Sequence, residues 1–98
     1  MNNKKIKLSV IIPVYNEEAI VGRVINDLKN ELNRLNLEYE IIAVNDGSLD
    51  KSREILENAE RIRLISHLYN KGYGASLKTG AKNANFDWLL APVFKLAP

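Results

Sequence analysis

The stretch that decides the fold is Val10-Ile11-Ile12-Pro13-Val14-Tyr15-Asn16-Glu17-Glu18. Its opening run of β-branched residues suits a strand that is covered on both faces, as the strands of parallel sheets are. We therefore expect a first strand over residues 6–14. Valine, isoleucine and leucine then recur at steps of three and four, which predicts an amphipathic helix over residues 17–35. Asn16 is its expected N-cap, and the two glutamates in its first turn would complement the positive end of the helix dipole.

Short apolar runs continue to alternate with helical patterns along the rest of the chain. The remaining strands are expected over 39–44, 62–68 and 88–91. A second helix is expected over 51–59 with Asp50 as its cap, and a third between the glycine-bearing loop 70–74 and about Asn85. A β-α-β-α-β-α-β order implies a parallel sheet with right-handed crossovers. The predicted fold class is α/β, with a parallel sheet of about four strands in the order 3-2-1-4 and three helices.

Length and composition set the class of protein. Of the 98 residues, 46% are hydrophobic and 27% are charged, which indicates one globular domain. The net charge of +2 is too small to predict a nucleic-acid partner. The absence of cysteine rules out disulfides and thiolate metal sites and fits a reducing compartment. No apolar run approaches the roughly 20 residues that span a bilayer, and the first residues lack a signal-peptide cleavage site. We expect a cytoplasmic location, free or peripheral at the cytoplasmic face of a membrane.

A ligand site is expected where the winding of the sheet reverses, between the first and fourth strands. Ligands of such sheets bind outside the carboxyl ends of the strands at this point. Residues 13–18 lie there, and they contain neither a G-x-G-x-x-G nor a Walker A motif. Tyr15 could stack on a planar base, and Glu17 could accept hydrogen bonds from ribose hydroxyls. Alternatively, Pro13 shapes a turn, Tyr15 covers the edge of the core, and Glu17 suits only the helix dipole.

Asp46 ends the second predicted strand at the same edge of the sheet. An ionised carboxylate only accepts hydrogen bonds, so it suits uracil or guanine, which carry a ring N–H. Alternatively, Asp46 belongs to an ordinary Asp-Gly turn with Gly47. Gly72 and Gly74 either admit a ligand phosphate or relieve crowding, and Gly80 indicates close helix packing. His67 has no cysteine, second histidine or nearby acid at ligand spacing, so we interpret it as a surface or hydrogen-bonded histidine.

Three segments in this order resemble family 2 glycosyltransferases with the GT-A fold, which is Rossmann-like. They are Val10 to Glu18, then Val44-Asn45-Asp46-Gly47-Ser48-Leu49-Asp50, and then Asn70-Lys71-Gly72-Tyr73-Gly74-Ala75 through Gly80. The likeness is greatest to dolichyl-phosphate mannose synthases and bacterial polyprenyl-phosphate glycosyltransferases, and it covers about residues 7–90. The resemblance implies that Pro13, Tyr15 and Glu17 line the base and ribose pocket. It also implies that Val44 and Asp46 contact the base.

The sequence departs from the family pattern in three places. Asn45 stands where the family usually has a first Asp. Leu77 occupies the position near which much of the wider family has an Arg, and this favours the polyprenyl-phosphate branch. Members also follow the fourth strand with an Asp-x-Asp motif that holds Mg²⁺ or Mn²⁺ on the diphosphate. Here the chain continues Ala91-Pro92-Val93-Phe94-Lys95-Leu96-Ala97-Pro98, and Asp87 is its last acid. Hard divalent cations need oxygen ligands, and this stretch supplies no carboxylate. We therefore predict no metal site in this chain.

The resulting prediction is a truncated half-domain. Residues 1–90 would be the nucleotide-binding half of a GT-A glycosyltransferase, and residues 91–98 an atypical tail that could be out of frame. The parent enzyme would transfer a hexose from GDP-mannose or a UDP-sugar to a polyprenyl or dolichyl phosphate, by in-line displacement with inversion. The chain alone would not catalyse this step, and its uncovered sheet edge would favour self-association.

Three function classes remain open from the sequence. The first is a transferase completed by a partner chain, and the second is a non-catalytic nucleotide-binding fragment. The third is an α/β interaction module, for example one resembling a receiver domain with Asp46 as the phosphoacceptor.

Overall fold

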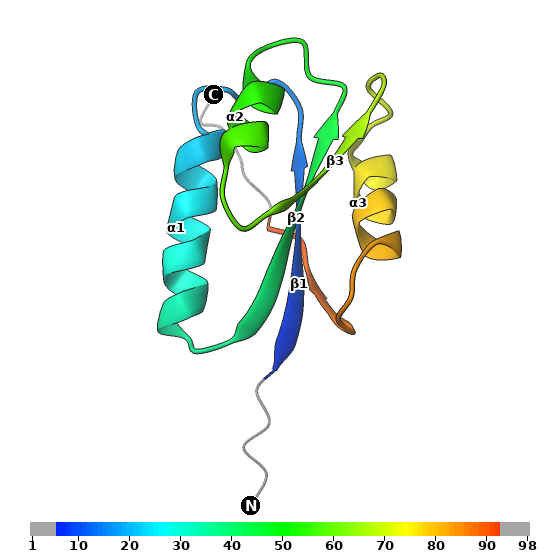
Figure 1. Cartoon of the computed structure of the whole chain (residues 1–98). Coiled ribbons are helices and arrows are strands. Elements are labelled where there is room, and N and C mark those ends of the chain that lie inside the picture. Colours follow the sequence, from blue (N-terminus) through cyan, green and yellow to red (C-terminus); the bar gives the residue numbers. More distant parts are fainter. Residues whose placement is uncertain (1–5, 93–98) are drawn as a thin grey trace, which may run out of the picture.

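A computed structural model describes residues 6–92 of the chain, and the order of its elements confirms the predicted α/β class (Figure 1). Four parallel strands form one sheet in the order β3-β2-β1-β4, as predicted. The strands are β1 Lys7–Val14, β2 Glu38–Asp46, β3 Arg63–His67 and β4 Trp88–Leu90. The helices are α1 Val21–Arg34, α2 Ser52–Asn58 and α3 Tyr73–Lys82. The winding direction reverses between β1 and β4, so the fold places its switch point beside the carboxyl end of β1.

The helices cover both faces of the sheet, α1 and α2 on one and α3 on the other (Figure 1). Alternate residues of β1 accordingly enter two separate cores. Val10, Ile12 and Val14 pack with α1 and α2, whereas Ile11 packs on the α3 side with Ile42 and Val44. The continuous β-branched run at the start of the chain is therefore explained by burial on both faces.

Gly80 lets α3 approach the sheet, as its position in the sequence indicates. A Cβ atom built on Gly80 would lie only 2.9 Å from Cγ1 of Ile11, and even closer to Cγ2. Any larger side chain would push the helix away from β1.

The prediction that Asn16 caps a helix beginning at Glu17 is wrong. Asn16 has a left-handed backbone with φ 52°, and α1 begins only at Val21, whose N-cap position is Ile20. Between them the chain makes a turn in which the carbonyl oxygen of Glu17 accepts the N–H groups of Ile20 and Val21. The physical reason is tertiary: the backbone N–H groups of this turn bind side chains of the loop after β2, and these long-range partners cannot be read from local spacing.

The second strand is longer than predicted, since Asn45 and Asp46 are its last two residues rather than part of a turn. Both pair in register with β3, opposite Ser66 and His67. Apart from the start of α1, the other boundaries lie within three residues of the predictions, as expected at fraying ends. The loop after β2 therefore begins at Gly47.

Strand β4 is short and pairs with β1 only along Leu8–Val10. On the β4 side, β1 has no neighbouring strand beyond Val10 within residues 6–92, whereas on its other side it pairs with β2 as far as Val14. The carboxyl end of β1 is therefore open on the β4 side. Within the same range, no helix combines the length and apolarity needed to cross a bilayer.

Candidate functional site

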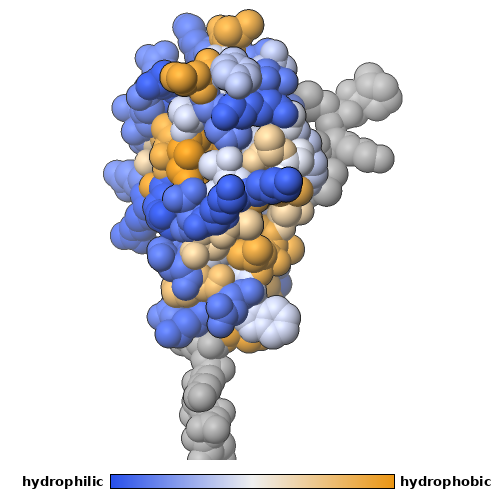
Figure 2. Space-filling model, turned by 90° about the vertical axis from the view of Figure 1, so that its right-hand side faces the viewer, coloured by the Kyte–Doolittle hydropathy of each residue, from blue (hydrophilic) through white to orange (hydrophobic). Residues whose placement is uncertain are grey.

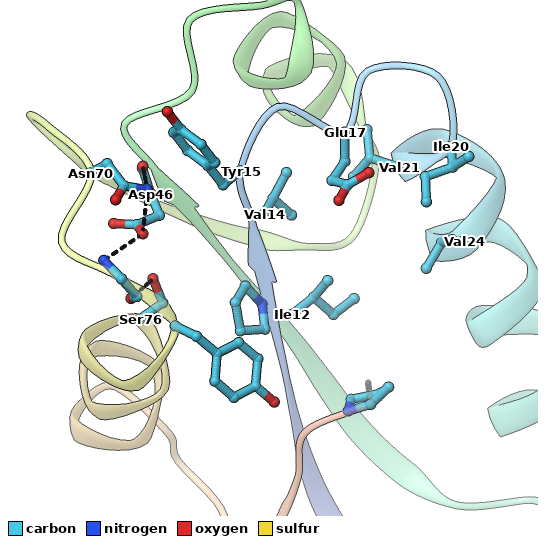
Figure 3. Close-up of a pocket in the computed structure, with 14 residues that line it drawn as sticks. Ile12, Val14, Tyr15, Glu17, Ile20, Val21, Val24, Asp46, Asn70 and Ser76 are labelled. Atoms are coloured by element: carbon cyan, nitrogen blue, oxygen red, sulfur yellow. Dashed lines mark hydrogen bonds between the residues drawn. The ribbon is translucent and has the colours of Figure 1, made fainter. Parts of the chain in front are cut away.

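A cleft of about 390 Å³ lies at the switch point, between the carboxyl end of β1, the start of α1 and the start of α3 (Figure 3). Four of the five predicted site residues lie on its wall, namely Pro13, Tyr15, Glu17 and Asp46. Residues from three distant segments of the chain thus meet at one edge of the sheet. The remaining lining residues are Ile12, Val14, Ile20, Val21, Val24, Asn70, Gly72, Tyr73, Ser76 and Pro92.

Tyr15 and Glu17 are two residues of this wall whose side chains remain available to a ligand. The side chain of Tyr15 is 42% exposed, and the Glu17 carboxylate accepts no hydrogen bond from any residue in the range 6–92. In the close-up, both stand at the end of β1, on opposite sides of Val14 (Figure 3). The cleft therefore offers an aromatic ring and a free carboxylate above an apolar floor.

Side chains of the β2–α2 loop hold Glu17 in place by binding the backbone around it. Three consecutive N–H groups donate to side chains of this loop or of the first residue of α2: Asn16 to Ser48 Oγ (3.0 Å), Glu17 to Ser52 Oγ (2.8 Å) and Glu18 to Asp50 Oδ2 (3.1 Å). Asn16 Oδ1 in turn accepts the N–H of Leu49 at 2.8 Å. Both the backbone N–H and the side chain of Asn16 are therefore bound to the loop, and these bonds fix its left-handed backbone. The fixed backbone orients the side chain of Glu17, the next residue, toward the cleft.

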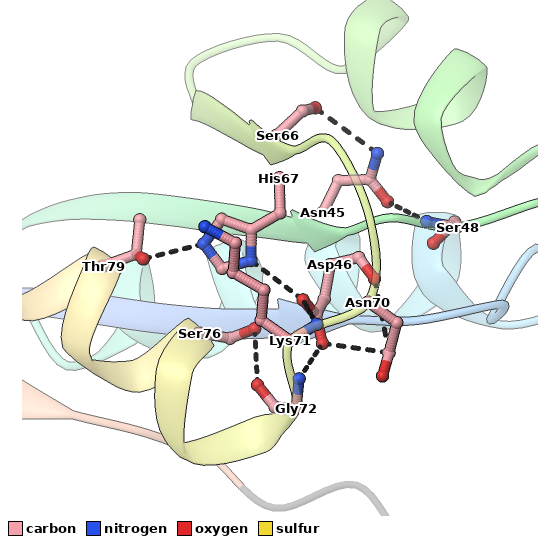
Figure 4. Close-up of polar contacts among 10 residues, drawn as sticks. All are labelled: Asn45, Asp46, Ser48, Ser66, His67, Asn70, Lys71, Gly72, Ser76 and Thr79. Atoms are coloured by element: carbon pink, nitrogen blue, oxygen red, sulfur yellow. Dashed lines mark hydrogen bonds and ion pairs between the residues drawn. The ribbon is translucent and has the colours of Figure 1, made fainter.

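Asp46 plays a different part from the other three residues (Figure 4). Only 3% of the residue is exposed, and each carboxylate oxygen accepts two hydrogen bonds. Oδ1 accepts from Lys71 N and lies against His67 Nδ1, each at 2.8 Å. Oδ2 accepts from Gly72 N at 2.9 Å and Asn70 Nδ2 at 3.1 Å. The carboxylate therefore fastens the loop before α3 to the end of β2, and that loop forms one wall of the cleft.

The surroundings of Asp46 favour its charged form. Burial by itself would raise the pKa of this carboxyl, but hydrogen bonds from His67 and from the N–H groups of Lys71 and Gly72 outweigh it and lower the pKa. His67 Nε2 lies 2.7 Å from Thr79 Oγ1. A neutral imidazole with its proton on Nδ1 satisfies both contacts, since it donates to Asp46 and accepts from the threonine hydroxyl. The sequence-based interpretation of His67 as a hydrogen-bonded histidine is confirmed, although its acid partner comes from another strand.

Val44, the fifth predicted residue, does not reach the cleft. Its side chain is fully buried on the α3 side of the sheet, in the core with Ile11 and Ile42. Strand alternation puts Val44 on the same side of β2 as Asp46, but Val44 lies two residues before the end of the strand, where it packs under Leu77 of α3. The structure thus assembles Pro13, Tyr15, Glu17 and Asp46 and leaves Val44 in the core.

Three cleft residues were not singled out from the sequence. They are Asn70, Tyr73 and Ser76, all from the loop before α3 or its first turn. Tyr73 is half exposed, and the Ser76 hydroxyl donates to the Gly72 carbonyl oxygen at 3.1 Å. The signal available was the glycine-bearing loop itself, because loops that connect the elements of a rigid scaffold often carry binding residues.

A divalent cation finds no suitable ligand set in the described part of the chain. Among residues 6–92, no three histidine, aspartate or glutamate side chains gather closely enough to hold a metal ion. Ala91 and Pro92, which follow β4, carry no ligand atoms on their side chains. Asp46 is already saturated by protein donors, which leaves Glu17 alone. Residues 6–92 therefore do not offer a ligand set that fits the Mg²⁺ or Mn²⁺ that the resemblance implies.

A parallel sheet in the order 3-2-1-4, with a cleft at its switch point, defines a Rossmann-like α/β protein. The chain belongs to glycosyl transferase family 2, whose pattern it matches over residues 9–91. It is 38% identical over 96 residues to an undecaprenyl-phosphate 4-deoxy-4-formamido-L-arabinose transferase of Aeromonas hydrophila subsp. hydrophila, covering 92% of this chain and 29% of that protein. A protein of the same description from Proteus mirabilis is 36% identical over 89 residues, covering 86% of this chain and 27% of that protein.

A solved structure supports the same assignment. The crystal structure of S. aureus TarS 1-349 superposes with a TM-score of 0.71 at 27% identity, over 89% of this chain and 27% of that chain. The 98 residues thus span less than a third of the length of these relatives. The expectation of a family 2 glycosyltransferase resemblance is confirmed.

Proposed function

We propose that this chain forms the nucleotide-sugar-binding part of a glycosyltransferase that moves a hexose to a polyprenyl or dolichyl phosphate. The donor would be GDP-mannose or a UDP-sugar. The observation that carries the proposal is the convergence of Pro13, Tyr15, Glu17 and Asp46 on one cleft at the switch point of the sheet. The two relatives named as undecaprenyl-phosphate transferases support the class of acceptor.

Different side chains of the cleft would contact the base and the ribose of the nucleotide. The Tyr15 ring, with Pro13 beside it, offers an apolar face for the base, and the Glu17 carboxylate accepts hydrogen bonds from ribose hydroxyls. Asp46 holds the opposite wall through its bonds to Lys71 and Gly72. Direct reading of a ring N–H by Asp46 stays a prediction, and it requires that one of the four present donors be displaced.

We expect these 98 residues to bind nucleotide without turnover. The developing charge on a leaving diphosphate needs neutralisation, which is a large part of catalysis in such transfers. Residues 6–92 do not gather the carboxylates that would hold a cation for this purpose. A non-catalytic nucleotide-binding role is therefore the second candidate function. The receiver-like alternative is disfavoured, because the Asp46 carboxylate is buried and has no free lone pair for phosphoryl transfer.

Isothermal titration calorimetry with GDP, UDP, ADP and CDP, without metal, tests the proposal. We expect weak binding of GDP or UDP and at least tenfold weaker binding of ADP and CDP. Tyr15→Ala should weaken binding about tenfold, because the ring provides most of the stacking area. Tyr69→Ala is the matched control, since this tyrosine is exposed nearby but does not line the cleft. Absence of binding at millimolar nucleotide would overturn the proposal.

We also propose self-association through the edge of β4. Its three residues, Trp88, Leu89 and Leu90, are all exposed, and no strand within residues 6–92 pairs with their outer side. An exposed apolar edge strand is a template for pairing with a second chain.

A further inference from the structure

Two loops at the carboxyl end of the sheet lie side by side, and their tips are apolar. A Cβ atom built on Gly47, in the β2–α2 loop, would lie 2.5 Å from the backbone nitrogen of Asn70, in the β3–α3 loop. These adjoining loops expose Leu68 (98%), Leu49 (88%) and Tyr69 (64%). We call these three residues, together with Lys71, the loop-tip surface.

These exposed side chains are not core residues that lack a covering element. Both faces of the sheet have buried clusters of their own, and neither cluster includes a residue of the loop-tip surface. The space-filling view shows apolar side chains at the upper end of the molecule, beside strongly hydrophilic ones (Figure 2). A single exposed leucine needs no explanation, but neighbouring apolar tips on two packed loops mark an interaction surface.

The charges around the loop-tip surface are of the kind that suits an anionic partner. Lys71 Nζ lies 5.3 Å from the centre of the Tyr69 ring, and Lys51 is exposed at the base of the other loop. Asp50, the acid next to Leu49, keeps its negative charge, but its oxygens are turned to the N–H groups of Glu18 and Ser52, and the two lysines outnumber it. This combination of aliphatic side chains, a tyrosine ring and lysines is typical of surfaces that bind at a membrane–water interface.

The loop-tip surface is continuous with the cleft. The segment that carries Leu68 and Tyr69 continues directly into Asn70, Gly72 and Tyr73, which line the cleft. A bilayer in contact with the tips would therefore lie next to the cleft.

We propose that the loop-tip surface docks on the surface of a bilayer that contains anionic lipids. This inference rests on the proposed function, because a polyprenyl phosphate acceptor is held in a membrane. Leu49, Leu68 and the ring of Tyr69 enter the headgroup region, and Lys71 pairs with lipid phosphates. Docking in this way places the acceptor phosphate beside the nucleotide cleft.

Vesicle binding of the 98-residue chain, measured without nucleotide or acceptor, tests this proposal separately from nucleotide binding. Because the chain contains no cysteine, Leu68→Cys gives a single labelling position for an environment-sensitive fluorophore. Leu35→Cys, at the opposite end of the molecule and also exposed, is the matched control. With vesicles of phosphatidylcholine and phosphatidylglycerol, we expect a blue shift and increased intensity from the probe at 68 and no change at 35.

Sedimentation with the same vesicles measures the affinity. Leu49→Ser combined with Leu68→Ser should lower the partition coefficient at least tenfold, and Lys71→Gln should lower it severalfold at low salt only. Lys82→Gln, in the last turn of α3, should have no effect. Far-UV circular dichroism checks that each variant is folded.

Two outcomes would overturn the proposal. One is equal sedimentation of the intact chain and the double leucine variant. The other is vesicle binding that disappears in Trp88→Ser but survives in the double leucine variant, which would assign the membrane contact to β4. Absence of vesicle binding by the intact chain would overturn the proposal as well. Nucleotide binding that persists in that case would leave the proposed function intact.

Discussion

Asp46 Oδ1 and His67 Nδ1 lie 2.8 Å apart, at the adjacent carboxyl ends of β2 and β3. Through His67 Nε2 the same chain of contacts reaches Thr79 in α3, and through Asp46 it reaches the loop before α3. One buried pair thus joins two strands, a loop and a helix. The wall of the cleft formed by Gly72 and Tyr73 depends on this pair for its position.

We expect Asp46→Asn to destabilise the fold by about 2–3 kcal/mol. The amide keeps one acceptor oxygen but replaces the other with a donor, which faces the N–H groups that now bind the carboxylate. Urea unfolding followed by circular dichroism measures the loss. Asp27→Asn, at an exposed acid of α1, should change stability by less than about 0.5 kcal/mol. Equal effects of the two substitutions would contradict the role given to Asp46.

Stability should fall in acid, through Asp46 and Glu40. Burial raises the pKa of Glu40, but hydrogen bonds from Ser9, Asn85 and Arg63 outweigh it, so both carboxyls have lowered pKa values in the folded chain. As the pH falls through about 4, these two carboxyls take up protons in the unfolded chain before they do so in the folded chain. Stability rises with pH wherever the unfolded chain binds more protons than the folded chain. The stabilisation is therefore complete above pH 5 and is lost as the pH falls through the folded-state pKa values.

Urea unfolding between pH 7 and pH 3 measures this loss. The double variant Asp46→Asn with Glu40→Gln should show a flatter dependence from a lower starting stability. The pair Asp27→Asn with Glu54→Gln, both at exposed positions, should retain the slope of the parent chain. A double variant at 40 and 46 with an unchanged slope would disprove the assignment.

Gly47→Ala and Gly74→Ala should change the stability of the fold in opposite directions. Gly47 has φ 71°, and a Cβ there would meet the backbone of Tyr69 and Asn70, which cannot move without breaking the bonds to Asp46. We expect a loss of at least about 2 kcal/mol. Gly74 lies in α3, and a Cβ there meets nothing within 4 Å, so alanine should stabilise the helix by up to about 1 kcal/mol. Thermal unfolding of both variants provides the comparison.

Glu17→Gln tests the contact with ribose. If Glu17 accepts hydrogen bonds from the sugar hydroxyls, the substitution should weaken binding of UDP or GDP about tenfold, since hydrogen bonds to charged groups are worth about 1.5–3 kcal/mol. It should have little further effect on 2′,3′-dideoxy analogues, because the hydroxyl partner is already absent. Glu18→Gln, at the adjacent exposed acid, is the control. Equal losses for ribose and dideoxyribose nucleotides would assign Glu17 to another role.

The edge of β4 should govern self-association. Analytical ultracentrifugation of the chain should show a concentration-dependent dimer, and Leu89→Lys should shift it to the monomer, because charge on an edge strand opposes pairing. Leu68→Lys should leave the dimer intact, because this exposed leucine directly follows β3, the strand at the other edge of the sheet. A parent chain that is monomeric at all concentrations would remove this proposal.

Much of the architecture follows from the sequence pattern. The alternation of β-branched runs with helical stripes predicts a parallel sheet with right-handed crossovers, and the structure has the predicted strand order 3-2-1-4. Chirality and periodicity are local properties, so they can be read without coordinates. The same topology predicts that Tyr15, Glu17 and Asp46 share one edge, and they do line one cleft.

Only the tertiary structure decided what each of these residues does at that edge. The turn at Asn16 depends on Ser48 and Leu49, more than thirty residues away, and local capping preference could not foresee it. Val44 and Asp46 point to the same side of β2, yet the first is sealed by α3 while the second reaches past it to the loop. Asp46 looks like a free acceptor in the sequence, but four donors from beyond β2 saturate it. Hydrogen-bond partners are set by distance in space, whereas the sequence records only distance along the chain.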